Sequence, residues 1–321
     1  MQIPEYFTYL SAQHLESLNL SAEAIVRSIE QLLGAAKQSH AWNAPKIVIM
    51  PDQRYLMATI SAADDPPFLA VKALVLNPRN HEQGLADINA LVTLLDSDTG
   101  VPLAIIDGNW ITAVRTAGLS AAAAKRLARS DSSVIAFIGC GVQARSHLKL
   151  LAQLFPLKEL RAFGRGVSNR DALCQLAETL GLRAIASGNA QAAIHDADLI
   201  VSTVTFSSQL VPFLDAHWLK PGAFATVTDL AAPWVKQSFS ELDYIVIDDC
   251  KQEAKMEIPL VNPRWVVGDL MDLVCETIKG RTRSEQKTAF IFRGLALGDL
   301  AVSALAYQVS QLQQIGFQIK R

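Results

Sequence analysis

The sequence has no long hydrophobic run, few cysteines and no surplus of either charge, and each shortage excludes a class of protein. No stretch reaches the ~20 uninterrupted apolar residues of a membrane helix, and the N-terminal residues lack the basic and apolar regions of a secretory signal. The 4 cysteines form no C-x-x-C pair, which argues against a zinc cluster or a disulfide framework. The 29 Lys and Arg nearly balance 31 Asp and Glu, so no large nucleic-acid surface is indicated. We expect a cytoplasmic protein without nucleic-acid, membrane or metal partners.

What is present is a large supply of core-forming residues. Of 321 residues, 50% are hydrophobic and only 19% are charged. This composition excludes a disordered chain. The length suggests about two domains.

The first third of the chain mixes helix and strand. Residues 21–36 carry apolar side chains at helical spacing and predict an amphipathic helix. Short apolar runs punctuated by Pro, Gly, Asp and Asn predict strands at 46–50, 55–60, 69–76, 91–95 and 103–106. Together with an Ala-rich helix over 111–128, they indicate an α+β domain with a curled sheet.

From residue 132 onward, apolar strands alternate with helices. Strands are predicted at 134–138, 160–163, 199–204, 223–227 and 244–247. This alternation is typical of an α/β domain with a parallel sheet covered on both faces. The residues from about 287 onward predict one long helix. We expect a Rossmann NAD(P)-binding domain over 119–295, inserted in a substrate-binding and dimerisation domain made of 1–118 and 296–321.

A phosphate-binding turn follows the strand at 134–138. The turn has the form Gly139-x-Gly141-x-x-Ala144, in which Gly139 permits a tight bend, Gly141 allows close approach of a pyrophosphate and Ala144 allows close helix–strand packing. The helix that follows directs its N–H groups toward the phosphates. Expected cofactor contacts are therefore Gly139, Gly141, Val142, Gln143 and Ala144. A purely structural glycine turn is the alternative.

The end of the second strand indicates which dinucleotide is bound. NAD sites usually place Asp or Glu there, but this chain has Arg165, with Ser168, Asn169 and Arg170 nearby. A guanidinium suits the additional 2′-phosphate, so NADP(H) is favoured and NAD(H) remains possible. The alternative is that these arginines are solvated loop residues. Thr203, at the polar end of the strand at 199–204, and Thr205, just beyond it, are two further expected cofactor contacts.

Motifs spread over most of the chain carry a family resemblance. They are 69–78 (LAVKALVLNP), 103–109 (LAIIDGN), 112–117 (TAVRTA), 139–144 (GCGVQA) and 294–299 (GLALGD). In order and spacing they resemble the ornithine cyclodeaminase/mu-crystallin family. The resemblance implies a homodimer formed through the sheet, and nicotinamide-dependent chemistry on an α-imino or α-amino acid. Family members include cyclodeaminases, ketimine reductases and amino-acid dehydrogenases.

The resemblance also implies roles for individual residues. Arg115 matches the arginine that clamps the substrate carboxylate, and Lys72 matches a lysine at the reacting centre. Lys46 falls where relatives often have an arginine that makes a second carboxylate contact, and Thr116 lies by the cofactor. Asp299 belongs to the last motif and is either a substrate contact or an acid at a helix interface.

One loop departs from the cyclodeaminase pattern. Cyclodeaminases carry an aspartate two residues before a proline after the fifth Rossmann strand, but here that position is Ala231, before Pro233. Asp229 lies two places earlier, so either the loop has a shifted register and Asp229 serves as the catalytic carboxylate, or the deaminase carboxylate is absent.

Reduction of an imine needs fewer proton transfers than cyclodeamination, so this loop favours a reductase. We expect NAD(P)H-dependent reduction of Δ1-pyrroline-2-carboxylate or Δ1-piperideine-2-carboxylate. The alternatives are an ornithine cyclodeaminase-type lyase, an acyclic amino-acid or iminosuccinate-type dehydrogenase, and a non-catalytic protein that binds NADPH and a small ligand.

Overall fold

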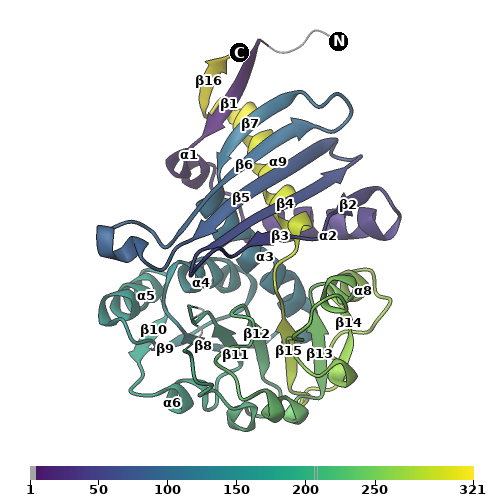
Figure 1. The fold of residues 1–321 in the computed structure, drawn as a ribbon. Coiled ribbons are helices and arrows are strands. Elements are labelled where there is room, and N and C mark those ends of the chain that lie inside the picture. Colours follow the sequence, from purple (N-terminus) through teal and green to yellow (C-terminus); the bar gives the residue numbers. More distant parts are fainter. Residues whose placement is uncertain (1–4, 206, 208) are drawn as a thin grey trace. The chain divides into compact units, whose positions relative to one another are not determined.

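A computed structural model describes residues 5–205, 207 and 209–321 and divides the chain into two compact units (Figure 1). Unit 1 contains the residues up to Arg115 together with Leu295–Arg321, and unit 2 is Thr116–Gly294. One helix, α3 (Gly108–Leu127), crosses this boundary. No helix of the described residues combines the length and the apolar character needed to cross a membrane.

Unit 1 is built on an eight-stranded sheet in the order β16-β1-β7-β6-β5-β4-β2, with β3 also pairing with β4. The long central strands form an antiparallel meander because short turns connect β4 to β5 and β6 to β7. The strands are β1 (Tyr6–Leu10), β2 (Ala41–Asn43), β3 (Ile47–Ile49), β4 (Tyr55–Ala63), β5 (Phe68–Leu76), β6 (Ile88–Asp96), β7 (Pro102–Asp107) and β16 (Phe317–Lys320).

The two faces of this sheet have different surroundings. Helix α9 (Ala296–Gln313) packs on β4 and β5 and also on α2 (Ala22–Lys37), and Figure 1 shows α9 running across the strands. A short helix, α1 (Ala12–Ser17), follows β1. Alternate side chains of the strands therefore point under α9, whereas the opposite side chains, such as Ile60 and Leu91, remain exposed.

Unit 2 is built on an eight-stranded parallel sheet in the order β10-β9-β8-β11-β12-β15-β13-β14. The strand order reverses between β8 and β11, as in a Rossmann fold, which confirms the expected fold class. The strands are β8 (Val134–Ile138), β9 (Glu159–Phe163), β10 (Arg183–Ala186), β11 (Leu199–Ser202), β12 (Phe224–Val227), β13 (Tyr244–Ile247), β14 (Val266–Asp269) and β15 (Thr288–Ile291). The helices after α3 are α4 (Val142–Leu154), α5 (Val167–Thr179), α6 (Ala190–Ile194), α7 (Cys250–Glu253) and α8 (Leu270–Val274).

The prediction of one long helix from about residue 287 is wrong. Thr288–Ile291 form the buried strand β15, and α9 begins only at Ala296. The run Thr-Ala-Phe-Ile-Phe is rich in β-branched and aromatic residues, which fit a buried parallel strand. Gly294, with φ of 106°, turns the chain between the two elements.

Candidate functional site

Strand β5 places a lysine beneath helix α9. Because side chains alternate along a strand, Ala70, Lys72 and Leu74 point to the same buried face, and Lys72 is only 1% exposed. A lysine is rarely buried to this degree unless it is paired.

A buried ion cluster surrounds this lysine within unit 1. Lys72 Nζ donates to Asp299 Oδ1 at 2.7 Å and more weakly to Thr112 Oγ1 at 3.4 Å. Arg115 Nε lies 3.1 Å from the same Asp299 oxygen, and the Thr59 hydroxyl donates to Asp299 Oδ2 at 3.4 Å. Two of the expected substrate-site residues, Lys72 and Arg115, therefore contact the third, Asp299.

The charges in this cluster perturb one another. Burial lowers the pKa of Lys72 to about 8; the Asp299 charge opposes that shift and the Arg115 charge adds to it. Burial alone would raise the pKa of Asp299, but the charges of Lys72, Arg115 and Lys46 hold it below its usual value. Lys46 thus joins the cluster electrostatically from the segment before β3.

The cluster has positive charge and a hydrogen-bond donor left over. Two cationic side chains, Lys72 and Arg115, contact the carboxylate of Asp299, and Lys46 acts on it electrostatically. Arg115 Nε and Nη1 are both buried and have no hydrogen-bond partner among the described residues, although Nε is ion-paired with Asp299. A buried guanidinium nitrogen without a partner is costly, and a substrate carboxylate is the group that would satisfy it.

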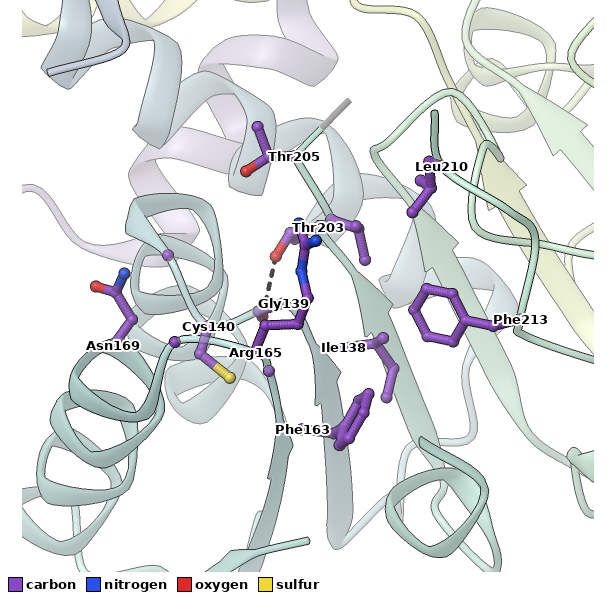
Figure 2. Close-up of a pocket in the computed structure, with 14 residues that line it drawn as sticks. Ile138, Gly139, Cys140, Phe163, Arg165, Asn169, Thr203, Thr205, Leu210 and Phe213 are labelled. Atoms are coloured by element: carbon purple, nitrogen blue, oxygen red, sulfur yellow. Dashed lines mark hydrogen bonds between the residues drawn. The ribbon is translucent and has the colours of Figure 1, made fainter. Parts of the chain in front are cut away.

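In unit 2, the turn after β8 needs glycine at its first position. Gly139 has φ of 89°, and a Cβ there would lie 2.6 Å from the carbonyl oxygen of Thr203. The Thr203 hydroxyl donates to the Gly139 carbonyl at 3.1 Å, shown by the dashed line in Figure 2. These contacts fix the turn against the end of β11.

The turn opens into a cavity of about 460 Å³, shown in Figure 2. A Cβ on Gly141 would meet no atom within 4 Å, so the backbone there is open to a ligand. Gly141 caps α4, whose first turn carries no acidic side chain to neutralise its positive end. This is the arrangement that binds a pyrophosphate.

Five of the expected cofactor contacts line this cavity: Gly139, Gly141, Arg165, Thr203 and Thr205. The Arg165 side chain extends toward Thr203 in Figure 2. The other expected contacts do not line it. Val142 is exposed, Ala144 is fully buried behind the turn, and Ser168 is exposed in the first turn of α5. Gln143 follows the turn within α4, and Thr116 is buried on α3.

Two aromatic side chains in the cavity wall were not predicted from the sequence. Phe163 and Phe213 meet edge to face, with ring centroids 6.4 Å apart, and both line the cavity. Such a wall suits the flat face of an adenine. Phe163 could have been found from its position at the end of the second strand, whereas Phe213 lies in a loop without any periodic pattern.

A series of buried side-chain hydrogen bonds holds the helix that follows the glycine turn. His147 of α4 bonds through Nδ1 to the Gln143 carbonyl at 2.7 Å and through Nε2 to the Ser120 hydroxyl at 2.9 Å. Thr226 of β12 donates to the same hydroxyl at 2.8 Å. Burial lowers the pKa of His147 to about 4, so the ring is neutral at physiological pH. These bonds tie α3, α4 and β12 together.

Both oxygens of Asp229 are already occupied within unit 2. Oδ1 accepts from the Ser202 hydroxyl at 3.2 Å and Oδ2 from the Val204 amide at 3.0 Å. Trp234 Nε1 donates in turn to Ser202 at 2.9 Å. These bonds anchor the segment that carries Thr203 and Thr205, and burial raises the pKa of Asp229 to about 7.

The position that matches the cyclodeaminase aspartate, Ala231, has no room for a solvated carboxylate. Ala231 is fully buried and has φ of 56°, in the left-handed region. It belongs to the apolar core of unit 2 with Leu214 and Trp234. A carboxylate at this position would be buried among apolar side chains.

Comparison with known proteins decides the family. The model of the ornithine cyclodeaminase/mu-crystallin family matches residues 8–312. The chain belongs to this family. It is 28% identical to alanine dehydrogenase of Archaeoglobus fulgidus, covering 97% of each chain. It is also 28% identical to ketimine reductase mu-crystallin of Mus musculus, covering 93% of this chain and 96% of that protein.

The same fold occurs in solved structures. Thermococcus litoralis Delta(1)-pyrroline-2-carboxylate reductase, in complex with NADH and L-proline, superposes with a TM-score of 0.89 at 24% identity, covering 98% of this chain and 100% of that one. This likeness shows that the two chains share the same fold. The family match confirms the resemblance inferred from the motifs, and the relatives support the expected enzyme class, an NAD(P)-dependent oxidoreductase.

Proposed function

We propose that the chain reduces a cyclic α-imino acid, Δ1-pyrroline-2-carboxylate or Δ1-piperideine-2-carboxylate, to L-proline or L-pipecolate with NAD(P)H. The observation that carries this proposal is the buried cluster of Lys72, Arg115 and Asp299, with its surplus positive charge and the unpartnered Nη1 of Arg115. Such a cluster suits a substrate that carries a carboxylate. The similarity to a ketimine reductase points to the same chemistry.

Each residue of the cluster has a distinct task in this proposal. Arg115 holds the substrate carboxylate and so fixes the orientation of the adjacent C=N carbon. Lys46 adds attraction for the anion. Lys72 in its ammonium form donates a proton or a hydrogen bond to the substrate. A reduced nicotinamide supplies the hydride that the C=N carbon accepts.

Unit 2 provides the dinucleotide contacts. The backbone of 139–141 and the N-terminus of α4 take the pyrophosphate, and Phe163 and Phe213 take the adenine. We propose that Arg165 meets a 2′-phosphate, which favours NADP(H) over NAD(H). Asp229 acts through the loop that it anchors, because it is buried and each of its oxygens already accepts a hydrogen bond within unit 2.

The exposed face of the unit 1 sheet supports a homodimer. Ile47 and Leu91 are 67% and 52% exposed, and with neighbouring apolar side chains of β3–β6 they line an open groove of about 640 Å³. Contiguous apolar surfaces of this kind usually bind a partner, and most soluble oligomers are symmetric dimers. We propose that a second copy of the chain covers this face.

A second candidate is an acyclic amino-acid dehydrogenase, which the similarity to an alanine dehydrogenase over 97% of the chain favours. One panel separates the two. The protein is mixed with NADPH or NADH and with the two cyclic imino acids, pyruvate plus ammonium, or oxaloacetate plus ammonium, and nicotinamide absorbance is followed. Preferential turnover of the cyclic substrates supports the proposal. Preferential turnover of pyruvate or oxaloacetate would replace it.

The remaining alternatives are tested in the same series. L-Ornithine with NAD⁺ is assayed for ammonia release, and rapid release with formation of proline would show a cyclodeaminase. Tight NADPH binding without turnover of any substrate would show a non-catalytic binding protein.

A further inference from the structure

We propose that Asp299 is a positioning residue and not a substrate contact: it holds Lys72 as an ammonium ion and forms an ion pair with Nε of Arg115, so that one N–H of Lys72 and the Nη1 group of Arg115 are left for the substrate. This inference rests on the proposed function for its kinetic consequence. The assignment of the charges can be tested without any substrate.

The hydrogen-bond directions support this division. An ammonium group has three N–H donors, and Asp299 Oδ1 and Thr112 Oγ1 take two of those of Lys72. On Arg115, Nε forms an ion pair with Asp299 at 3.1 Å without the geometry of a hydrogen bond, and the buried Nη1 has no hydrogen-bond partner among the described residues. One lysine N–H and the Nη1 group, which Asp299 does not hold by a hydrogen bond, are thus the donors we assign to a ligand.

Both oxygens of Asp299 are engaged by other side chains of the cluster. Oδ1 faces both cations and Oδ2 accepts from Thr59, while the side chain as a whole is only 3% exposed. A substrate carboxylate would also be repelled by this carboxylate. Asp299 therefore acts on the substrate only through Lys72 and Arg115.

The surroundings of Lys72 show why Asp299 determines its charge. Two side chains of α3 lie near Lys72. The charge of Arg115 disfavours the ammonium form of Lys72, whereas Thr112 is neutral. From β4, the neutral Thr59 sits opposite Lys72 in the strand register. Lys46 adds a further positive charge near Asp299. Asp299, from α9, is the group in this set that favours the ammonium form, and it acts against the burial of the lysine.

The decisive variant is Asp299→Asn, which keeps the size of the side chain and removes its charge. We expect the titration midpoint of Lys72 to fall by about one pH unit or more, since an opposite charge at this distance typically shifts a pKa by ~1–3 units. The midpoint is read by NMR of protein labelled at lysine Nζ and Cε, with Lys72→Arg identifying the signal. Thr59→Val is the matched control, because it removes a weak hydrogen bond to Asp299 without changing the charge, and it should leave the midpoint in place.

The kinetic test uses the full pH profile of kcat/KM with a cyclic imino acid. In Asp299→Asn, the alkaline limb should move to lower pH together with the NMR midpoint, and Lys72→Arg should lose that limb. An Asp299→Asn protein whose KM rises while neither midpoint moves would overturn the proposal in favour of a substrate contact. An equal shift in Thr59→Val would also overturn it.

Asp299→Glu covers the case in which the asparagine variant does not fold. It retains the charge, so the Lys72 midpoint should stay near its wild-type value while kcat falls because the carboxylate is displaced. A midpoint that drops in this variant would contradict the proposal. If no imino acid is reduced by the wild-type protein, the proposed function fails, but the NMR titration still decides the role of Asp299.

Discussion

Lys72 and Asp299 form an ion pair of 2.7 Å in which both side chains are almost completely buried, at 1% and 3% exposure. The two residues are 227 positions apart, so the pair joins a strand from the start of the chain to the last helix. Removing one partner of such a pair leaves an uncompensated buried charge.

Lys72→Met should therefore lower stability as well as activity. The free energy of unfolding, measured with urea, should fall by up to about 3–5 kcal/mol, and Arg115 keeps the loss toward the lower end because it still pairs with Asp299. The matched control is Lys46→Met, at a half-buried position, which should change stability by no more than about 0.5 kcal/mol. If both variants lost the same free energy of unfolding, the buried ion pair could not be the cause of the loss in Lys72→Met.

Arg115→Ala should impair both substrate binding and turnover. Because the guanidinium would both bind and orient the carboxylate, KM should rise and kcat should fall, with kcat/KM reduced about 100-fold or more. Arg126→Ala, on the same helix α3, is the control, since Arg126 lies in the last turn and not in the ion cluster. Steady-state kinetics on the imino acid give both constants. Unchanged kinetics in Arg115→Ala would remove this residue from the site.

Arg165→Ala should distinguish the two dinucleotides. If the guanidinium meets a 2′-phosphate, the Kd for NADPH should rise about tenfold or more while the Kd for NADH changes little. Arg170→Ala serves for comparison, because Arg170 is already paired with Asp171 at 3.1 Å. Fluorescence titration of the reduced dinucleotides measures both constants. Similar losses for NADPH and NADH would rule out the 2′-phosphate contact.

Asp229→Asn should change how stability depends on pH. Burial raises the pKa of Asp229 from 3.8 to about 7 in the folded protein. The stabilisation that the protonated carboxyl gives the folded state is therefore fully present below the pKa of the unfolded chain and is lost as the pH rises through 7. Asparagine stays neutral, can still accept from the Val204 amide, and can donate to Ser202. The variant should therefore gain stability relative to wild type between pH 4 and 7. Urea unfolding across this range tests it, and parallel profiles would refute the raised pKa.

Leu91→Glu should separate a dimer formed through the open sheet face. A charge in the middle of a buried apolar interface is strongly unfavourable, so sedimentation should show monomers at concentrations where wild type is dimeric. Leu312 lies near the end of α9 and is 85% exposed, so Leu312→Glu adds the same charge away from this face and should leave the dimer intact. A wild-type protein that sediments as a monomer would refute the interface itself.

The sequence predicted the elements whose patterns are local. The turn at 139–144 has a fixed form, and the alternation around it identified the parallel sheet, because strand–turn–helix units are encoded by nearby residues. The strand β15 was mistaken for helix because its apolar run is too short to show a period and runs on toward a true helix. Arg115 and Lys72 were found by resemblance. Their shared contact with Asp299 was not predicted, since it depends on the docking of α9 on the sheet.

The backbone around Ala231 limits how an enzyme of this kind could change its chemistry during evolution. The residue occupies the left-handed region and is enclosed by Leu214, Trp234 and their neighbours. A single codon change to aspartate would place the new carboxylate in this apolar core, where it would destabilise the protein before it could help catalysis. Passage from this loop to a cyclodeaminase loop would require a new backbone path first, so the two activities should be separated by a rearranged segment and not by one substitution.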